Sequence, residues 1–316
     1  MSMTDTNFSH TSVLLFECIE ALNIRNGFTY IDCTAGGGGH SLEIAKRMGP
    51  DSKLICFDRD KNAIKAATER LRDYLDKVIF INDNFSSLDK VACELGLTNV
   101  GGVLADLGCS SHQFDTPDRG FSYMHDARLD MRMDTNAALS AYDVVNNYSE
   151  AEIKRIIFDY GEERFAPRIA AAICRSRQDK PIETTHELSD IIKGCIPAAA
   201  RVDGPHPAKR TFQAIRIEVN GELDCIDPLI TSASNILTPG GRIAIISFHS
   251  LEDRLVKQRY RTLATGCTCP KDFPVCICGK KPILKEINKK PILPSTSELA
   301  NNPRSRSAKL RIAEKI

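Results

Sequence analysis

Short apolar runs alternate with amphipathic segments over the first third of the chain. Four of these runs predict buried strands, at 28–31, 53–57, 78–81 and 102–105. The segments between them place apolar residues at helical spacing, as Ala63, Ala67 and Leu71 do. Strands that alternate with helices predict a parallel sheet that binds its ligand at the carboxyl ends of the strands.

Beyond the fourth strand the alternation stops. No strand is indicated between 112 and 210, and the polar segment 123–134 predicts an irregular loop. The capping boxes Ser149-Glu150-Ala151-Glu152 and Thr184-Thr185-His186-Glu187 predict helix starts. This part of the chain is therefore predicted to be a compact helical insertion.

Sheet-forming sequence returns in the last third. A long helix is predicted at 211–237, a turn at 238–241 and a buried strand at 242–248. The Pro- and Lys-rich final thirty residues predict only partial order before the closing AKLRIAEKI. The chain is thus predicted to be an α/β protein with a discontinuous sheet domain, 1–112 and 211–316, and an all-helical domain inserted at 113–210.

The stretch YIDCTAGGGGHS joins the first strand to the helix that follows it. Glycines in such a turn let the backbone approach a ligand and aim helix N–H groups at it. The dinucleotide pattern G-x-G-x-x-G lacks its third glycine, because Gly36 and Gly38 are followed by Ser41. A methyltransferase pattern, acid-x-Gly-x-Gly-x-Gly, fits from Asp32 with one substitution, at Thr34. The turn alone leaves both cofactors open.

Composition predicts a globular protein of the cytoplasm. Of 316 residues, 42% are hydrophobic and 26% charged, and no apolar run approaches the ~20 residues of a membrane helix. The N-terminus, MSMTDTNFSHTS, has neither a basic start nor an apolar signal core, so no membrane partner is expected. Eight of the twelve cysteines are scattered singly through apolar segments, as reduced core cysteines are.

The net charge of +1 is unevenly distributed. From Arg254 to Ile316 there are 15 Lys and Arg against 4 Asp and Glu, a net of +11, so the preceding residues carry −10. A basic tail on an acidic body is usually solvated surface, but it also suits a polyanionic partner.

Acidic residues follow two of the predicted strands. Asp58 follows the second strand, where it would accept hydrogen bonds from ribose hydroxyls with either cofactor. Asp106 opens the segment DLGCSSHQ after the fourth strand, where a methyltransferase presents its acceptor. Enzymes that methylate amino groups often carry Asp or Asn, then Pro-Pro and an aromatic residue here. This chain keeps the acid and lacks the rest.

Ten segments together resemble the bacterial 16S rRNA cytosine-N4 methyltransferase family, also called MraW. They run in the family's order from His10 to Arg311: HTSVLLFECIEAL, YIDCTAGGGGHS, FDRD, DLGCSSHQFD, RGFSY, LDMRMD, YGEERFAPRIA, HPAKRTFQAIRIEVN, SFHSLEDRLVK and NPRSRSAKLR. The resemblance implies a class I, Rossmann-like methyltransferase domain with an inserted helical domain that recognises the substrate. It also implies S-adenosylmethionine as the cofactor, and as the substrate a cytidine in the decoding region of 16S rRNA in the small ribosomal subunit.

Carried over residue by residue, the family's cofactor pocket falls on seven positions. These are Gly38, Gly39, His40, Asp58, Phe85, Asp106 and Gln113. On this interpretation the glycines let the turn lie against a bulky sulfonium cofactor rather than a pyrophosphate. The alternatives are core packing for Phe85 and a helix cap for His40.

Asp106 is the leading catalytic candidate. It would accept an N–H bond from the cytosine amine and draw the delocalised lone pair toward the methyl group, or it would contact only the cofactor. His249 follows the strand at 242–248, at the same sheet edge, and would touch the base or a phosphate. The competing interpretation of His249 is a solvent-facing side chain.

Basic and aromatic residues outside the pocket are candidates for holding RNA. Arg210, Arg304 and Arg306 would bind the backbone, and Phe212 would support the unstacked base. The alternative is that these are ordinary surface residues with no role in binding.

Four late cysteines, in GCTCPKDFPVCICG, have C-x-C spacing at each end. Cys267, Cys269, Cys276 and Cys278 would complete a tetrahedral structural zinc site, or would be free thiols. The resemblance does not imply this metal.

Two functions of other classes compete with an RNA base methyltransferase. An NAD-dependent oxidoreductase is disfavoured by the missing third glycine. A non-catalytic RNA-binding protein with a degenerate pocket is disfavoured by the complete set of Gly38, Gly39, His40, Asp58 and Asp106.

Overall fold

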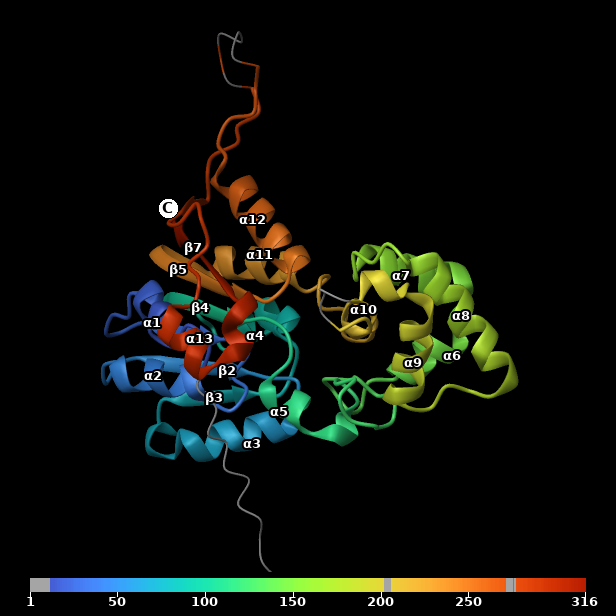
Figure 1. Ribbon diagram of the computed structural model, residues 1–316. Helices are drawn as coiled ribbons and strands as arrows, with labels where there is room; N and C mark the ends of the chain where they lie inside the picture. Colours follow the sequence, from blue (N-terminus) through green and yellow to red (C-terminus); the bar gives the residue numbers. More distant parts are fainter. Residues whose placement is uncertain (1–11, 202–205, 271–274, 276) are drawn as a thin grey trace, which may run out of the picture. The chain divides into compact units, whose positions relative to one another are not determined.

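A computed structural model describes residues 12–201, 206–270, 275 and 277–316 (Figure 1). The chain divides into two compact units, one formed by Met1–Gly108 and Leu223–Ile316 and the other by Cys109–Glu222. The first boundary between the units, after Gly108, lies close to the predicted boundary at 112. The second lies twelve residues later than the predicted boundary at 211, because the helix there packs into the helical unit.

The larger unit is built on one seven-stranded sheet in the order β3-β2-β1-β4-β5-β7-β6. The strands are β1 (Thr29–Asp32), β2 (Lys53–Phe57), β3 (Val78–Ile81), β4 (Val100–Asp106), β5 (Leu237–Ser247), β6 (Leu284–Glu286) and β7 (Lys309–Lys315). The first five are parallel, and β7 runs antiparallel to both β5 and β6. The predicted α/β class with a Rossmann-like parallel sheet is confirmed.

Helices cover both faces of this sheet (Figure 1). On one face lie α1 (Leu15–Leu22), α2 (Gly39–Arg47) and α3 (Lys61–Arg70). On the other lie α4 (Leu88–Glu94), α11 (Ile226–Ile236) and α12 (Ser250–Ala264). Tyr30 and Leu54 point into the first core, whereas Ile31 and Ile55 point into the second. Burial on both faces explains why the central strands are continuous apolar runs without alternation.

Three sequence-based predictions in the last third are wrong. The single helix at 211–237 is two helices, α10 (Lys209–Asn220) and α11, because Gly221 takes a left-handed φ of 58° and ends α10. The predicted turn at 238–241 is not a separate element: it lies inside β5, where the register with β4 shifts between Val100 and Gly102 and Gly240 takes a left-handed φ of 79°. The tail is regular before its closing strand, with α13 (Thr296–Asn301) and the 3₁₀ helix η5 (Pro303–Ser307).

The smaller unit is helical, as predicted. It contains α5 (Ser111–Asp115), α6 (Ala141–Asn147), α7 (Glu150–Asp159), α8 (Ala166–Asp179), α9 (Thr185–Cys195) and α10. Both predicted capping boxes form: Ser149 with Glu152 starts α7, and Thr184 with Glu187 starts α9. The helices enclose a core of their own.

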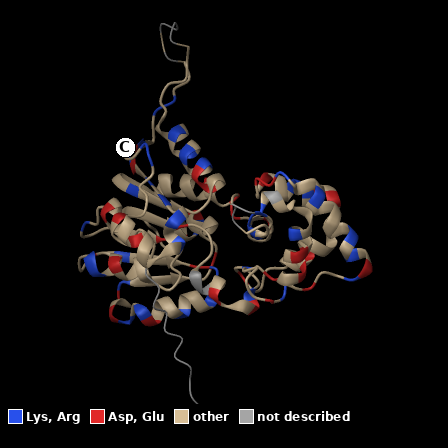
Figure 2. Ribbon diagram, in the orientation of Figure 1, with Lys and Arg blue, Asp and Glu red and all other residues tan. Residues whose placement is uncertain are grey.

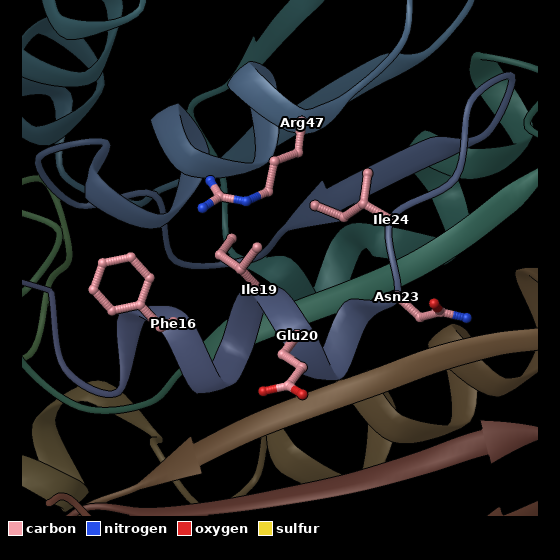
Figure 3. Close-up of a pocket in the computed structure, with 6 residues that line it drawn as sticks. All are labelled: Phe16, Ile19, Glu20, Asn23, Ile24 and Arg47. Carbon is pink, nitrogen blue, oxygen red and sulfur yellow. The ribbon is translucent and has the colours of Figure 1, made fainter.

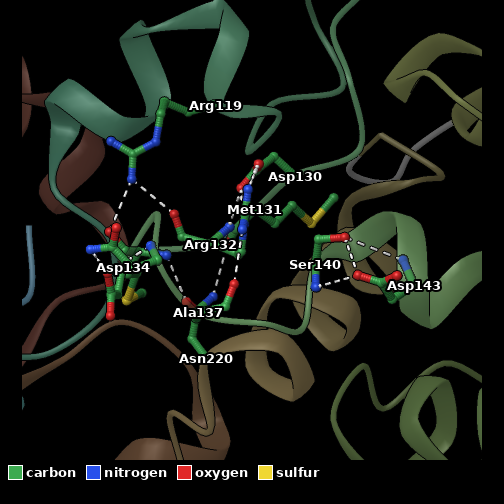
Figure 4. Close-up of polar contacts among 11 residues, drawn as sticks. Arg119, Asp130, Met131, Arg132, Asp134, Ala137, Ser140, Asp143 and Asn220 are labelled. Carbon is green, nitrogen blue, oxygen red and sulfur yellow. Dashed lines mark hydrogen bonds and ion pairs between the residues drawn. The ribbon is translucent and has the colours of Figure 1, made fainter.

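Residues 123–134 form an irregular loop, as predicted, and polar contacts hold it in place (Figure 4). Arg132 makes a two-pronged contact with Asp130, at 3.0 Å and 2.6 Å, around Met131, which has a left-handed φ of 56°. Asn220 donates to the Met131 carbonyl and accepts from the Met133 backbone N–H, both at 2.8 Å. The loop is therefore tied to α10 within its own unit.

Among the residues that the structure describes, no helix combines the length and apolar character needed to cross a bilayer.

Candidate functional site

The glycine turn lies between β1 and α2, and two of its glycines adopt backbone angles that other residues avoid. Gly36 has φ 51° and Gly38 has φ 78°. A Cβ added at Gly38 would also lie 3.0 Å from Leu71 and 3.1 Å from Ala67, so this position excludes side chains on two grounds. As the N-cap of α2, Gly38 offers no capping side chain. The turn thus presents backbone alone toward the sheet edge.

Acids end three neighbouring strands around this turn. Asp32 closes β1, Asp58 directly follows β2 and Asp106 closes β4, and these strands are adjacent and parallel. Burial raises the pKa of both Asp58 and Asp106, and the charge of Asp32 raises each further. Three carboxyl groups therefore gather at this edge, and their charged forms would be stabilised by a cationic ligand and opposed by a pyrophosphate.

Asp58 holds the turn itself. Its Oδ2 accepts a 2.8 Å hydrogen bond from the Gly36 N–H, and its Oδ1 accepts one of the same length from the Asp60 N–H. Burial raises the pKa of Asp58 to about 6, although these two N–H bonds act to lower it. The Asn82 amide donates to the Asp58 carbonyl at 2.9 Å and fixes the backbone. Each carboxylate oxygen has a second lone pair that a ribose hydroxyl would use.

Asp106 is under-satisfied. Its Oδ1 is buried and has no hydrogen-bond partner among the described residues, while its Oδ2 lies 4.0 Å from His40 Nδ1. The Asp106 backbone N–H donates to the Thr34 hydroxyl at 2.6 Å, which fixes the residue's position. A buried polar atom without a partner costs free energy, and a ligand that donates to it would recover that cost.

His40 lies at the first turn of α2, and its ring is buried. Its Nε2 is 3.0 Å from the Val13 carbonyl. Because a carbonyl only accepts, Nε2 carries a proton and donates. Burial lowers the pKa of His40, which favours the neutral ring with Nδ1 as an acceptor. The predicted alternative of a helix cap does not apply, since Gly38 is the N-cap.

Asp32 and Ser41 are a pair whose roles the sequence did not assign. Asp32 accepts from the Ser41 hydroxyl at 2.5 Å and from the Thr34 N–H at 3.1 Å, and both side chains are buried. The hydrogen bonds of Asp32 therefore connect the start of the glycine turn, at Thr34, to its end, at Ser41. The sequence feature that could have predicted this pair is an acid at the end of the first strand followed by a hydroxyl residue on the next helix.

Phe85 begins the short 3₁₀ helix η2 (Phe85–Ser87) after β3. Its ring is partly buried against the second core of the sheet unit, and the Arg59 guanidinium lies 5.9 Å from the ring centroid. Core packing thus accounts for part of the ring, and contact with adenine stays a prediction.

Gln113 belongs to the helical unit, on α5. It is buried, and its Oε1 accepts from the Ser110 N–H at 3.1 Å. Its contact with a cofactor stays a prediction.

His249 is neither solvent-facing nor unconstrained, so that alternative is wrong. It is the N-cap of α12, where it forms a capping box with Glu252, and its side chain is 8% exposed. Its Nε2 lies 3.2 Å from Glu252 Oε1. Since one nitrogen serves the cap and the other faces a carboxylate, a direct role in catalysis stays only a prediction.

Phe212 does not support a base in this structure, because its ring is 3% exposed in the core of the helical unit. It contacts Tyr123 edge-on, with ring centroids 5.5 Å apart, and Tyr123 stacks on His206 at 4.2 Å. An aromatic residue in a mixed helical pattern gave no sign of which face it occupies. The neighbouring Arg210 donates to the Glu162 carbonyl at 3.0 Å and is half-exposed.

The basic tail is partly structural. Arg311 and Lys309 pair with Asp253 at 2.6 Å and 3.4 Å, so not all of the positive charge is available to a partner. Arg304 and Arg306 are exposed on η5. Figure 2 shows further Lys and Arg along α12.

Three of the four late cysteines come together. Sulfur atoms of Cys267, Cys269 and Cys278 all lie within 4.8 Å of one another. Cys276 lies outside the described residues.

A surface hollow of about 460 Å³ lies elsewhere on the sheet unit, beside α1 and the end of α2 (Figure 3). It is lined by Phe16, Ile19, Glu20, Asn23, Ile24 and Arg47. Arg47 ends α2, whereas the glycine turn begins it, so this hollow lies away from the acidic edge. None of the seven predicted cofactor-binding residues lines this hollow.

Comparison with known proteins gives a consistent result. The model of the MraW methylase family matches residues 7–316. The chain is 58% identical over 309 residues to the ribosomal RNA small subunit methyltransferase H of Clostridioides difficile, covering 98% of this chain and 99% of the relative. The proteins of that name from Ruminiclostridium cellulolyticum and Finegoldia magna are 55% and 53% identical, each over 98% of this chain and 99% of their own length.

Proposed function

The chain belongs to the MraW methylase family, and from this premise we propose that it methylates the N4 amine of a cytidine in 16S rRNA, with S-adenosylmethionine as the methyl donor. The name of these relatives, ribosomal RNA small subunit methyltransferase H, supports an RNA substrate. The cytidine, its N4 atom and its place in the decoding region follow the family resemblance of the sequence.

One observation carries the proposal: Asp106 Oδ1 is buried without a partner among the described residues, at the end of β4 and on the acidic edge beside the glycine turn. That oxygen is a ready acceptor for an N–H group. The acidic edge also fits the sulfonium and ammonium charges of S-adenosylmethionine. A pyrophosphate would be repelled there, which counts against the oxidoreductase alternative.

The residues present fit the cofactor. Gly38 and Gly39 would let its bulk approach the backbone, Asp58 would accept from the ribose hydroxyls, and Phe85 would lie beside the adenine. When bound, the sulfonium supplies a methyl group that is already activated for transfer. What remains for the protein is positioning and the control of charge.

Asp106 has the decisive role in that positioning. The lone pair of the cytosine amine is delocalised into the ring, so the amine is a poor nucleophile. A hydrogen bond from this amine to Asp106 Oδ1 would hold the nitrogen in line and increase its electron density as the new bond forms. Burial raises the pKa of Asp106 and so favours its neutral form. The positive charge of a bound sulfonium would lower this pKa and favour the carboxylate.

The helical unit is proposed to recognise the RNA. Its Tyr123–His206 stack, with centroids 4.2 Å apart, is the kind of aromatic surface on which unpaired bases stack. Arg210, 52% exposed, would contact the backbone.

The test is methylation by the purified full-length chain. Small ribosomal subunits and naked rRNA from cells that lack this modification are incubated with labelled S-adenosylmethionine, and nucleosides are identified by mass spectrometry. N4-methylcytidine is expected. Asp106→Asn should lower turnover far more than it weakens cofactor binding, because the interaction strengthens only as charge develops. Asp227→Asn, an exposed change on α11, is the control.

Two results would count against the proposal. Methyl transfer to a different nucleoside, or none with either substrate, contradicts the assigned function. Equal losses of turnover and cofactor affinity in Asp106→Asn would make Asp106 a cofactor ligand only.

A further inference from the structure

Three cysteines lie close together on the segment between α12 and β6. Cys267 and Cys269 follow the end of α12, and Cys278 comes eleven residues after Cys267. Their sulfur atoms all lie within 4.8 Å of one another. The chain therefore brings thiols from both ends of this segment to one point.

The sulfur geometry matches a shared metal ion. The Sγ atoms of Cys267 and Cys278 are 3.7 Å apart. A disulfide requires about 2.05 Å. Two thiolates at about 2.3 Å from one tetrahedral zinc ion would be about 3.8 Å apart. The observed separation thus agrees with two ligands of one zinc ion and excludes a bond between these sulfurs.

The backbone beside the cysteines supports thiolates. The Cys269 N–H points at Cys267 Sγ, 3.4 Å away, and such a contact stabilises negative charge on sulfur. Gly279, which directly follows Cys278, has a left-handed φ of 60°, so the chain turns sharply as it leaves the cluster. Both features orient the local chain around the sulfur atoms.

This segment has little else to hold it. Val275 is 70% exposed and Ile277 is 76% exposed, so its apolar side chains form no core. Its described residues contain neither helix nor strand between Ala264 and Leu284. In Figure 1 they extend away from the sheet. Metal binding provides folding free energy where burial does not.

We propose that Cys267, Cys269 and Cys278 bind one structural zinc ion, which ties together the two ends of this segment. Thiolate ligands in tetrahedral arrangement select zinc among the common divalent metals of the cell. A structural site takes four ligands, and the remaining cysteine of the sequence motif, Cys276, lies outside the described residues.

The first test is the metal content of the full-length chain purified without chelators. Elemental analysis should find about one zinc per chain. Cys269→Ser and Cys278→Ser should each lower the zinc content severalfold. Cys93→Ser is the matched control, since Cys93 is an exposed cysteine on α4, and it should keep the metal.

The second test is the spectrum of cobalt added to zinc-depleted protein. Wild type and Cys93→Ser should give the intense thiolate-to-cobalt absorption of a tetrahedral site, and Cys278→Ser should not. Absence of zinc from the wild type, iron in its place, or cobalt without thiolate absorption would overturn the proposal. None of these readouts depends on methyl transfer, so the proposed function would stand or fall separately.

Discussion

At the scale of single residues, three acids at one sheet edge differ because their hydrogen-bond partners differ. Asp32 accepts bonds at both oxygens from the ends of the glycine turn, and Asp58 accepts two backbone N–H bonds. Asp106 leaves one buried oxygen without a partner among the described residues. The first two acids hold the turn in shape, and the third is the one available to a donor group of a ligand.

Asp58 makes the pH dependence of this edge predictable. Its pKa in the folded protein is raised from 3.8 to about 6, so the folded state binds more protons than the unfolded state between these values. The stability contributed by protonated Asp58 is therefore full below about pH 4 and is lost as the pH rises through 6. The ligand-free protein carries the cost of an ionised buried acid at neutral pH.

We predict that cofactor affinity increases with pH, whereas the stability contributed by Asp58 decreases with pH. A ribose hydroxyl donates more strongly to the carboxylate than to the acid, so affinity for S-adenosylhomocysteine should increase from pH 5 to pH 7, around the pKa of about 6. Asp58→Asn should bind more weakly and without this pH dependence. Asp58→Ala should lose about 1.5–3 kcal/mol of binding free energy.

Calorimetry of variants that remain folded measures both effects. Asp51→Asn changes an exposed acid that precedes β2, at the opposite end of that strand from Asp58, and should behave as wild type. Unchanged affinity in Asp58→Ala would show that this carboxylate serves only the turn.

At the scale of elements, the last strand is tied to the sheet unit by charge as well as by backbone pairing. Arg311, on β7, reaches Asp253, on α12, at 2.6 Å and 3.2 Å, and both side chains are largely buried. Burial alone would raise the pKa of Asp253, but Arg311 and Lys309 together hold it below its usual range. The ion pair thus connects an edge-region strand to the helix that covers it.

Asp253→Asn is predicted to destabilise the protein by about 1.5–3 kcal/mol, because it removes the charge that the largely buried Arg311 guanidinium pairs with. Wild-type stability should also fall on acidification through the depressed pKa of Asp253, since the pair is complete only above it. Urea unfolding measures the change. Asp227→Asn removes the partner of Arg259 but is 65% exposed, and it should cost less than about 1 kcal/mol. Similar small losses in both variants would mean that backbone pairing alone holds β7.

At the scale of the whole molecule, the excess of positive charge lies at the end of the chain, and some of these cations form ion pairs within the sheet unit. Arg311 and Lys309 pair with Asp253, and Arg304 and Arg306 are exposed. The tail therefore combines structural cations with cations that would meet a polyanion.

We predict that Arg304 and Arg306 contact RNA phosphates. Each contact releases counterions, so replacing both with alanine should make the log–log salt dependence of RNA binding shallower by about 1.4. Cofactor affinity and the choice of base should persist, because phosphate contacts position the RNA without reading its sequence.

Salt-titrated RNA binding is the measurement, and Arg72→Ala with Lys90→Ala is the control. Those two side chains are 70% and 74% exposed on the sheet unit and should leave the slope unchanged. The same slope in wild type and in the tail variant would identify the tail as solvated surface.

What the sequence by itself determined is local. Periodicity located the parallel strands and the helical insertion, because burial on a strand or helix leaves a repeating apolar pattern. The glycine turn, the capping boxes and the acids that end β1, β2 and β4 were also readable, since each depends on residues a few positions apart.

Only the tertiary structure decided which side chains are free to act. Phe212 lies in a core with Tyr123, and His249 contacts Glu252. The sequence pattern was compatible with exposure of both side chains, and both are buried by their neighbours. The break at Gly221 and the tail strand beside β5 likewise depend on packing. Burial and the satisfaction of a polar atom are set by neighbours distant in the chain, and no local pattern contains them.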